Sequence, residues 1–313
     1  MIYFLATEAH CYTFQDLPKS IKSRSRVVSY EEIQKLKNQQ AGPIIFTDLD
    51  RLSSKQLLQV TQVYDQLKDQ NPEIPLLNNP AKVLLRYDLL KRLYKEGIND
   101  FNIFRESEDL SEMHFPVFVR SEHVHTYNSG LGLAFNTAQL VRNISNHTGA
   151  GADLHRLIIT ECCDVSDEYG IFNKYAAYFI NGQVIPRHLY YSKNWYVSAK
   201  SVREVPEINI DRFDLHEKYI QSNPHKEWIQ NVFEIAGTDY GRIDYGLKNG
   251  VPQVWEINLN PNFSTNVVKD PEPDSLDGRR ARIFSDFNEK FELELIKLDH
   301  PSEQSEKLLK WNF

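Results

Sequence analysis

Four polar residues in the last third of the chain have the types and spacing needed for phosphate and metal chemistry. They are Arg242, Asp244, Glu256 and Asn258. They lie in two apolar-polar segments, 241–247 and 252–259, which are joined by Lys248-Asn249-Gly250. An Asn-Gly pair between two such segments predicts a hairpin. Residues two apart share a face of a strand, so each strand presents both of its polar residues on one side.

If Asp244 pairs across the hairpin on that face, two carboxylates and an amide oxygen converge. This donor set suits a hard divalent cation, and Mg²⁺ fits best when phosphates and water supply the other ligands. Arg242 beside it would hold a phosphoryl or acyl-phosphate oxygen. The alternative is an ordinary surface hairpin. We favour the site, because the polar residues agree in phase and the other face is apolar.

The composition is that of a globular protein. The chain has 313 residues, 41% of them hydrophobic and 12% aromatic, which predicts a core and excludes disorder as the main state. The length suggests about two domains, or one large composite one. The net charge of −7 argues against nucleic acid and against anionic lipid as partners. Three cysteines cannot form a disulfide framework, and no segment is long and apolar enough for a membrane span or a signal peptide, so a cytoplasmic location is expected.

The first 75 residues predict a small parallel α/β unit. Apolar runs at 2–6 and 43–46 are typical of buried strands. Ser29 and Glu32 have capping-box spacing and predict a helix to about residue 40, and helical spacing continues over 53–69. Strands that alternate with helices favour a parallel sheet.

The middle of the chain predicts a second group of elements. An amphipathic helix is expected over 81–96, with Gly97 at its end and Leu84, Leu90, Leu93 and Tyr94 facing inward. A short strand at 115–120 and a helix at about 133–147 follow.

Three further segments, 156–163, 174–182 and 183–192, predict a strand meander with Asn181-Gly182 at one turn. A helix is expected from Pro224 to Gly237, and the last helix from about 279 to 298.

The sequence resembles a known family at the hairpin. R-x-D followed by E-x-N-x-x-P, here ending in Glu256, Asn258 and Pro261, is similar to the metal-binding signature of the ATP-grasp superfamily. Its members include D-alanine–D-alanine ligase, glutathione synthetase and the ligases that add glutamate to ribosomal protein. The resemblance covers residues 75–265 by motif and 1–75 by pattern only.

The resemblance implies an α/β class with α+β lobes, in which two lobes clasp ATP. It places a Rossmann-like α/β domain at 1–78 and a lobe with the phosphate loop at 79–153. A lobe with the adenine hinge and the metal hairpin follows at 154–300, and a tail at 301–313.

The resemblance also implies roles for the charged residues. Asp244, Glu256 and Asn258 would bind Mg²⁺, or Mn²⁺ in its place, bridging the ATP phosphates, and Arg242 would steady the transferred group. Arg120 stands where the family usually has a lysine on the α- and β-phosphates. Arg86, on the preceding helix, is expected to be the other basic contact. For both arginines the alternative is a solvated surface residue.

The segment from Ser121 to Gly132 would be the loop that covers the phosphates, since such loops need glycine for close approach. His123 and His125 lie in it. One of them is expected to contact phosphate or substrate; otherwise both are exposed loop residues.

In the same comparison, Glu161 would accept the adenine amino group. Cys162 and Cys163 would be apolar walls of the adenine pocket, because no His/Asn arrangement marks a catalytic thiol. Lys174 stands near the family's usual ribose-binding carboxylate, and is expected to reach a phosphate instead.

The segment 185–195 is rich in Arg, His, Tyr and Trp. Arg187 and His188 in it are expected to face the acceptor substrate or the acyl phosphate. The alternative is a strand with ordinary cross-strand aromatic pairs.

The function implied is an ADP-forming ligase that joins a carboxylate to an amine through an acyl phosphate. Its substrates would be small molecules or peptides. A small-molecule kinase and a nucleotide-binding module without turnover remain alternatives. Homodimers are common among such proteins, so a homodimer also stays open.

Overall fold

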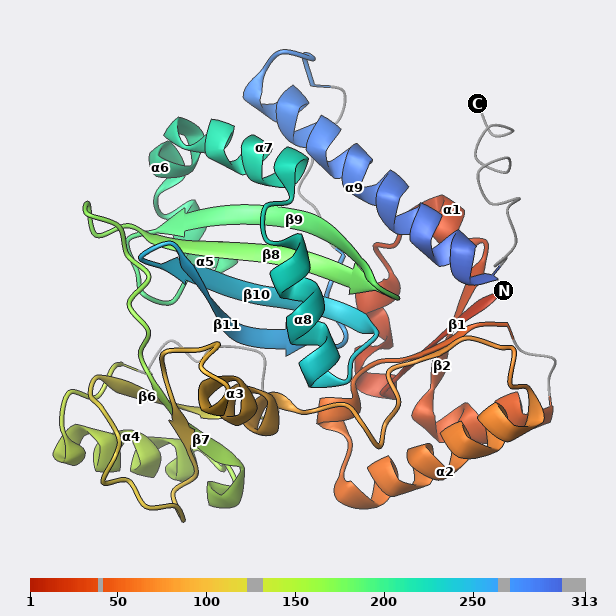
Figure 1. The fold of residues 1–313 in the computed structure, drawn as a ribbon, viewed down its shortest axis with the longest axis horizontal. Helices are drawn as coiled ribbons and strands as arrows, with labels where there is room; N and C mark the ends of the chain where they lie inside the picture. Colours follow the sequence, from red (N-terminus) through yellow and green to blue (C-terminus); the bar gives the residue numbers. More distant parts are fainter. Residues whose placement is uncertain (39–41, 123–131, 264–270, 300–313) are drawn as a thin grey trace.

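The computed structural model describes residues 1–38, 42–122, 132–263 and 271–299, and these form three β-sheets with flanking helices (Figure 1). The predicted α/β class is confirmed by one parallel and two antiparallel sheets. Met1 and the end of the last described helix lie together, where the terminal amine contacts the Asp299 carboxylate at 2.8 Å.

The N-terminal sheet is parallel, with the strand order β2-β1-β3-β4. Its strands are β1 (Ile2–Ala6), β2 (Ser25–Ser29), β3 (Ile44–Phe46) and β4 (Leu76–Leu77). Every residue of β1 and β3 is buried, as their continuous apolar runs predict. The helix expected from Ser29 is instead a 3-10 segment, Tyr30–Asn38, because Ser29 belongs to β2.

Two long helices cover this sheet. α2 (Ser54–Gln70) packs Val60, Val63 and Leu67 on one side, and its Ser53 forms a capping box with Gln56. α9 (Leu276–Asp299) packs Phe291 and Leu295 against the other side, beside Phe4 of β1. Because α9 also reaches the antiparallel sheet, it ties the two parts together (Figure 1).

The smaller antiparallel sheet has the order β5-β7-β6. Its strands are β5 (Ile103–Phe104), β6 (Val117–Ser121) and β7 (Leu157–Glu161), and α4 (Thr137–Gly149) packs against them. α3 (Arg86–Lys95) is shorter than the helix expected over 81–96. Tyr94 on it is exposed, which corrects its predicted inward position.

The larger antiparallel sheet has the order β11-β10-β8-β9. Its strands are β8 (Phe172–Ile180), β9 (Gln183–Ser192), β10 (Tyr240–Lys248) and β11 (Val251–Asn258). The predicted three-strand meander is wrong, since β7 pairs with β5 and β6 while β8 pairs with β9 and β10. The Asn181-Gly182 turn between β8 and β9 is present, with positive φ at both residues.

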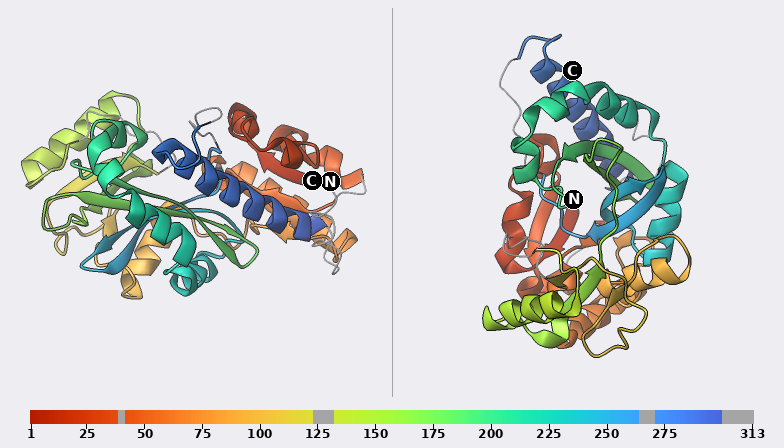
Figure 2. Two further views of the ribbon diagram at one scale, coloured as in Figure 1. Left: turned by 90° about the horizontal axis from the view of Figure 1, so that it is seen from above. Right: turned by 90° about the vertical axis from the view of Figure 1, so that its left-hand side faces the viewer.

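Helices pack on both faces of this sheet, and α9 contacts the polar face at Tyr178, whose ring lies 5.0 Å from that of Phe287. α8 (Lys226–Ala236) and α3 pack on the apolar face, around Ile243 and Tyr245. Three short helices, which the sequence pattern did not predict, follow β9: α5 (Ala199–Arg203), α6 (Pro206–Asp211) and α7 (Phe213–Ser222). Figure 2 shows the larger sheet between the N-terminal and the smaller sheets.

None of the helices in the described residues is both long and apolar enough to cross a lipid bilayer.

Candidate functional site

The β10–β11 hairpin brings its polar residues together. Asp244 lies directly opposite Glu256, and Arg242 directly opposite Asn258. The four side chains therefore share one face, in the phase that their spacing predicts. The turn is made by Asn249 and Gly250, both at positive φ.

A β-bulge adds an aromatic residue to this face. Register shifts between Asp244 and Tyr245, so Val254 opposes Tyr245 and Trp255 has no opposite residue. A bulge redirects a side chain, which lets the consecutive Trp255 and Glu256 line the same pocket. The sequence pattern had placed Trp255 on the opposite, apolar face.

The neighbouring strands extend the polar face. Ala176 of β8 lies between Asp244 and His188 of β9 in the register, and Lys174 follows on the same side. The small alanine leaves the space above Asp244 open to the longer side chains around it.

Asp244 is held by two cations. It is only 1% exposed, and its Oδ2 lies 2.7 Å from Lys174 Nζ. Arg242 grips both carboxylate oxygens, at 2.8 Å and 3.0 Å. Burial alone would lower the pKa of the Arg242 guanidinium. Its contacts with Asp244, together with other nearby groups, raise the pKa overall. This pair is bidentate, the geometry in which Arg–carboxylate contacts are strongest.

Glu256 is held by the other two basic residues predicted for the site. Its Oε2 lies 2.5 Å from Arg86 and 3.4 Å from Arg120. Arg86, at 7% exposed, also donates to the Glu122 carbonyl. Burial and the nearby Arg86 charge lower the pKa of Arg120 to about 10. Neither arginine is therefore a solvated surface residue.

Within the described residues, the ion pairs of this cluster join four cations to two carboxylates. The cations are Arg86, Arg120, Lys174 and Arg242, and the carboxylates are Asp244 and Glu256. Buried charge in excess is costly unless a counter-ion binds. The site is thus built for an anion that reaches several cations at once, such as a polyphosphate.

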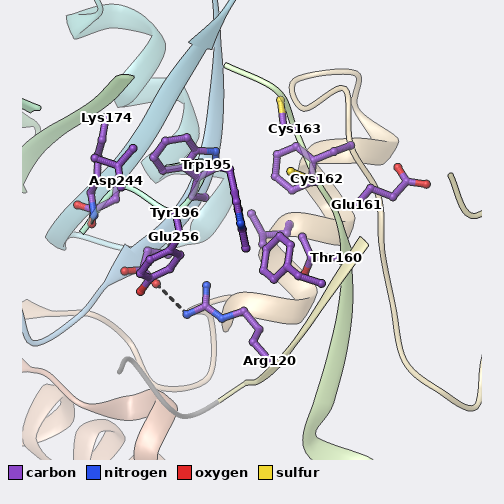
Figure 3. A pocket seen from close by; sticks show the side chains of 15 residues that line it. Arg120, Thr160, Glu161, Cys162, Cys163, Lys174, Trp195, Tyr196, Asp244 and Glu256 are labelled. Atoms are coloured by element: carbon purple, nitrogen blue, oxygen red, sulfur yellow. Dashed lines mark hydrogen bonds and ion pairs between the residues drawn. The ribbon is translucent and has the colours of Figure 1, made fainter. Parts of the chain in front are cut away.

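A largely apolar pocket continues from the cluster (Figure 3). Its walls include Leu90, Phe101, Phe118, Cys162, Cys163, Trp195 and Trp255. Phe118 and Trp195 face each other with ring centroids 5.0 Å apart. An apolar slot with a cationic end suits a ligand that has an apolar body and an anionic group.

The two cysteines behave as wall residues. Burial raises the pKa of the Cys162 thiol to about 11 and that of Cys163 to about 12. Both stay protonated at neutral pH, and a thiol is a far weaker nucleophile than a thiolate.

The Glu161 carboxylate does not serve the pocket in the predicted way. Its oxygens accept from the backbone N–H groups of Asn102 and His114, each at 2.7 Å. Figure 3 shows this carboxylate turned away from Trp195 and Arg120. Its predicted contact with an adenine amino group is therefore not favoured, although Glu161 lies on the pocket wall.

Arg187 lies outside the pocket described above. It sits over the rings of Phe284 and Phe287 of α9, at 5.0 Å and 4.6 Å from their centroids. Burial and the nearby charge of Arg242 lower the pKa of the Arg187 guanidinium.

The described residues do not form a complete divalent-cation site by themselves. Within the described ranges, no group of three or more His, Cys, Asp and Glu residues could hold a metal. Asp244 and Glu256 face each other, and the Asn258 side-chain oxygen already accepts from the Asn260 N–H at 3.0 Å. Two carboxylates and one amide fit a Mg²⁺ ion that arrives with phosphate oxygens, rather than one held by the protein alone.

Several pocket residues were not singled out from the sequence. Trp195 and Tyr196 follow β9, and Thr160 precedes Glu161 on β7. Trp195 stood in the aromatic segment 185–195, where composition was the only signal. The predicted phosphate loop, with His123, His125 and Gly130, lies outside the described residues.

Comparisons with known proteins gave matches only among solved structures. No protein-family model matches the chain, and no curated protein matches its sequence. D-alanine–D-alanine ligase from Bacillus anthracis is similar over 94% of this chain and 98% of its own, with 15% identity and a TM-score of 0.48. L-amino acid ligase from Bacillus licheniformis is similar over 82% and 67%, with 13% identity and a TM-score of 0.48.

A RimK domain ATP-grasp protein from Sphaerobacter thermophilus is similar over 92% of this chain and 98% of its own, with 12% identity and a TM-score of 0.46.

Proposed function

We propose that the protein is an ATP-grasp ligase that joins a carboxylate to an amine with hydrolysis of ATP to ADP. One observation carries this proposal: Asp244 and Glu256 face each other within four cations, at the end of an apolar slot. The slot suits a purine base and the cations suit a triphosphate. In this proposal the lobes 79–153 and 154–300 hold the nucleotide between them, and the domain 1–78 precedes them in the chain.

Each charged residue has a place in this proposal. Arg86, Arg120 and Lys174 bind the phosphate oxygens, and Asp244, Glu256 and Asn258 hold Mg²⁺ on the phosphates. When bound, Mg²⁺ neutralises charge on the phosphates and withdraws electron density from the transferred group. Arg242, fixed by its bidentate contact with Asp244, orients the transferred phosphoryl group.

The reaction proceeds in two displacements. An oxygen of the substrate carboxylate attacks the γ-phosphorus, the bond to ADP breaks, and an acyl phosphate forms. The amine nitrogen then attacks the acyl carbon, inorganic phosphate leaves, and the nitrogen loses a proton. No protein nucleophile is required, because catalysis here is positioning and charge neutralisation. The two protonated thiols agree with this scheme.

The test is an ADP-release assay on a panel of amino acids and short peptides, with mass spectrometry of the products. We expect ADP, phosphate and an amide in equal amounts, and a loss of at least a hundredfold in kcat for Arg242→Gln. Release of AMP and pyrophosphate would contradict the acyl-phosphate chemistry. A stable phosphorylated product would identify a kinase instead.

One observation favours a second candidate, a nucleotide-binding module without turnover. Both carboxylates are already ion-paired with protein cations, which compete with a metal for the same oxygens. The module predicts nucleotide binding that is indifferent to Mg²⁺, and intact ATP after long incubation with the whole panel.

A further inference from the structure

Arg187 occupies an irregular position on β9. His188 pairs with Ala176 and Pro186 with Ala177, so Arg187 is the extra residue of a β-bulge. Bulges re-aim side chains, and this one turns the guanidinium onto the rings of Phe284 and Phe287. The side chain keeps partial exposure, so a solute can reach it.

Arg187 differs from the other cations that lie over aromatic rings. In the described part of the chain these others are Lys91, Arg105, Arg212, Arg279 and Arg280. Each of them also forms an ion pair with an Asp or Glu. For Arg187, by contrast, no hydrogen bond or ion pair with a described residue is present. A ring face attracts a cation but does not neutralise it.

The surroundings of Arg187 are positive. Arg242 lies near enough to repel it, and both guanidinium groups act on the hydroxyl of Tyr178. Burial, aided by the Arg187 charge, lowers the pKa of His188 well below its usual range and that of His216 to about 4. Both imidazoles are therefore neutral at pH 7, and the Nε2 atom of each is buried without a partner in the described residues.

A partly buried cation in positive surroundings is stabilised by an anion, which the described residues do not supply to Arg187. Arg242 lies between Arg187 and the ion pairs of Asp244 and Glu256, because it is itself paired with Asp244. An anionic group on Arg187 would therefore belong to a molecule whose other end lies at Asp244 and Glu256. A planar guanidinium that is stacked in place matches a carboxylate through two parallel hydrogen bonds.

We infer that Arg187 binds a substrate carboxylate that is not the one activated, so that the substrate class is an acidic amino acid or a peptide with a second carboxylate. This inference rests on the proposed ligase function for the identity of the substrate. The carboxylate site itself does not depend on that function.

The test uses glutarate, with two carboxylates, and butyrate, with one, as inert probes. Isothermal titration calorimetry measures both on the full chain, with and without AMP-PNP and Mg²⁺. We expect glutarate to bind wild type at least tenfold more tightly than butyrate. Arg187→Gln should reduce this ratio to near one, and Arg187→Lys should keep part of it.

Arg212→Gln is the matched control, because Arg212 also lies over a ring of β9, that of Tyr191, but has Asp167 as its partner. This variant should keep the glutarate preference. A ratio near one in wild type, or an unchanged ratio in folded Arg187→Gln, would overturn the inference. Failure of AMP-PNP to bind, with the glutarate preference intact, would instead count against the ligase function.

Discussion

Glu161 and Glu256 both lie on the wall of the pocket, yet their carboxylates have different partners. Glu161 accepts from two backbone N–H groups and faces away from the slot, whereas Glu256 lies among arginines. The resemblance implied an adenine contact for Glu161 and a metal ligand for Glu256. Residue type and strand position could not show the partners of Glu161, because they are the backbone N–H groups of Asn102 and His114, which only the folded chain brings to this carboxylate.

Glu161→Gln should therefore act on stability rather than on nucleotide binding. The amide keeps one acceptor oxygen and loses one of two charge-assisted bonds, which costs about 1–2 kcal/mol of unfolding free energy. We expect the affinity for ATP, and its preference over GTP, to change by less than about threefold. Denaturant unfolding measures the loss of stability, and calorimetry measures the nucleotide affinity. A lost preference for ATP over GTP would contradict this prediction and support the adenine contact of Glu161.

The buried imidazole of His216 gives a pH dependence to stability. Its folded pKa of about 4 lies below the ordinary value of 6.5, mainly because of burial. Between these values the unfolded chain binds more protons, so stability is complete above pH 6.5 and falls as the pH decreases toward 4.

At pH 5 this residue should cost the folded state about 2 kcal/mol relative to pH 7. Urea unfolding of wild type and His216→Gln at both pH values measures it. The variant should lose part of the decrease, since His188 has a shift of the same direction. An identical decrease in both proteins would contradict this assignment.

Among the elements, those with strong local signals were predictable. The two Asn-Gly hairpins and α2 formed as expected, because turn chemistry and helical periodicity act between near neighbours. The capping box of α2, Ser53 with Gln56, was not predicted, and the one predicted at Ser29 precedes a 3-10 segment instead. The two-residue strands β4 and β5 are too short to show an alternation. The helices α5 and α6 begin with local signals, a capping box at Ser198 and Pro206 in the first turn, which were not recognised in the sequence. The meander failed because strand partners are chosen by long-range packing, which apolar alternation does not encode.

The β10–β11 hairpin also holds a close contact that positions Trp255. A Cβ on Gly246 would lie 2.6 Å from the indole and 2.9 Å from Val165, closer than atoms can approach. Gly246→Ala should displace the ring from the pocket wall. We expect a loss of about 1–3 kcal/mol in stability and of about fivefold in nucleotide affinity, from weakened aromatic contact.

Gly250→Ala is the control for this prediction. Its φ of +81° makes alanine strained, but nothing lies within 4 Å of an added Cβ. It should lower the melting temperature without changing nucleotide affinity. Equal affinities for Gly246→Ala and wild type would show that Trp255 is not a wall of the nucleotide site.

At the scale of the whole molecule, Asn78 joins the N-terminal sheet to the larger antiparallel sheet. Its Nδ2 donates to the carbonyls of Phe46 and Tyr240, both at 2.9 Å. Its Oδ1 accepts from the N–H groups of Asp239 and Tyr240. The resemblance named all four cations of the site, but not their ion pairs with Asp244 and Glu256. These cations come from α3, β6, β8 and β10, which only the tertiary fold brings together.

Asn78→Ala should remove all four bonds at once. Buried backbone groups left without partners cost about 1–3 kcal/mol each, so we expect at least about 3 kcal/mol lower unfolding free energy. Asn79→Ala, which loses an exposed bond to the Ala81 N–H and a side-chain bond with Tyr64, should cost no more than about 2 kcal/mol. Denaturant melts compare the two variants, and equal losses would contradict the joining role.

The central claim is that Asp244 and Glu256 hold Mg²⁺ on a bound nucleotide, and calorimetric titration of AMP-PNP tests it most directly. We predict that Mg²⁺ tightens binding at least tenfold in wild type and in Glu161→Gln, but less than twofold in Glu256→Gln. Binding of equal strength with and without Mg²⁺ in wild type, or an unchanged Mg²⁺ effect in Glu256→Gln, would contradict the account.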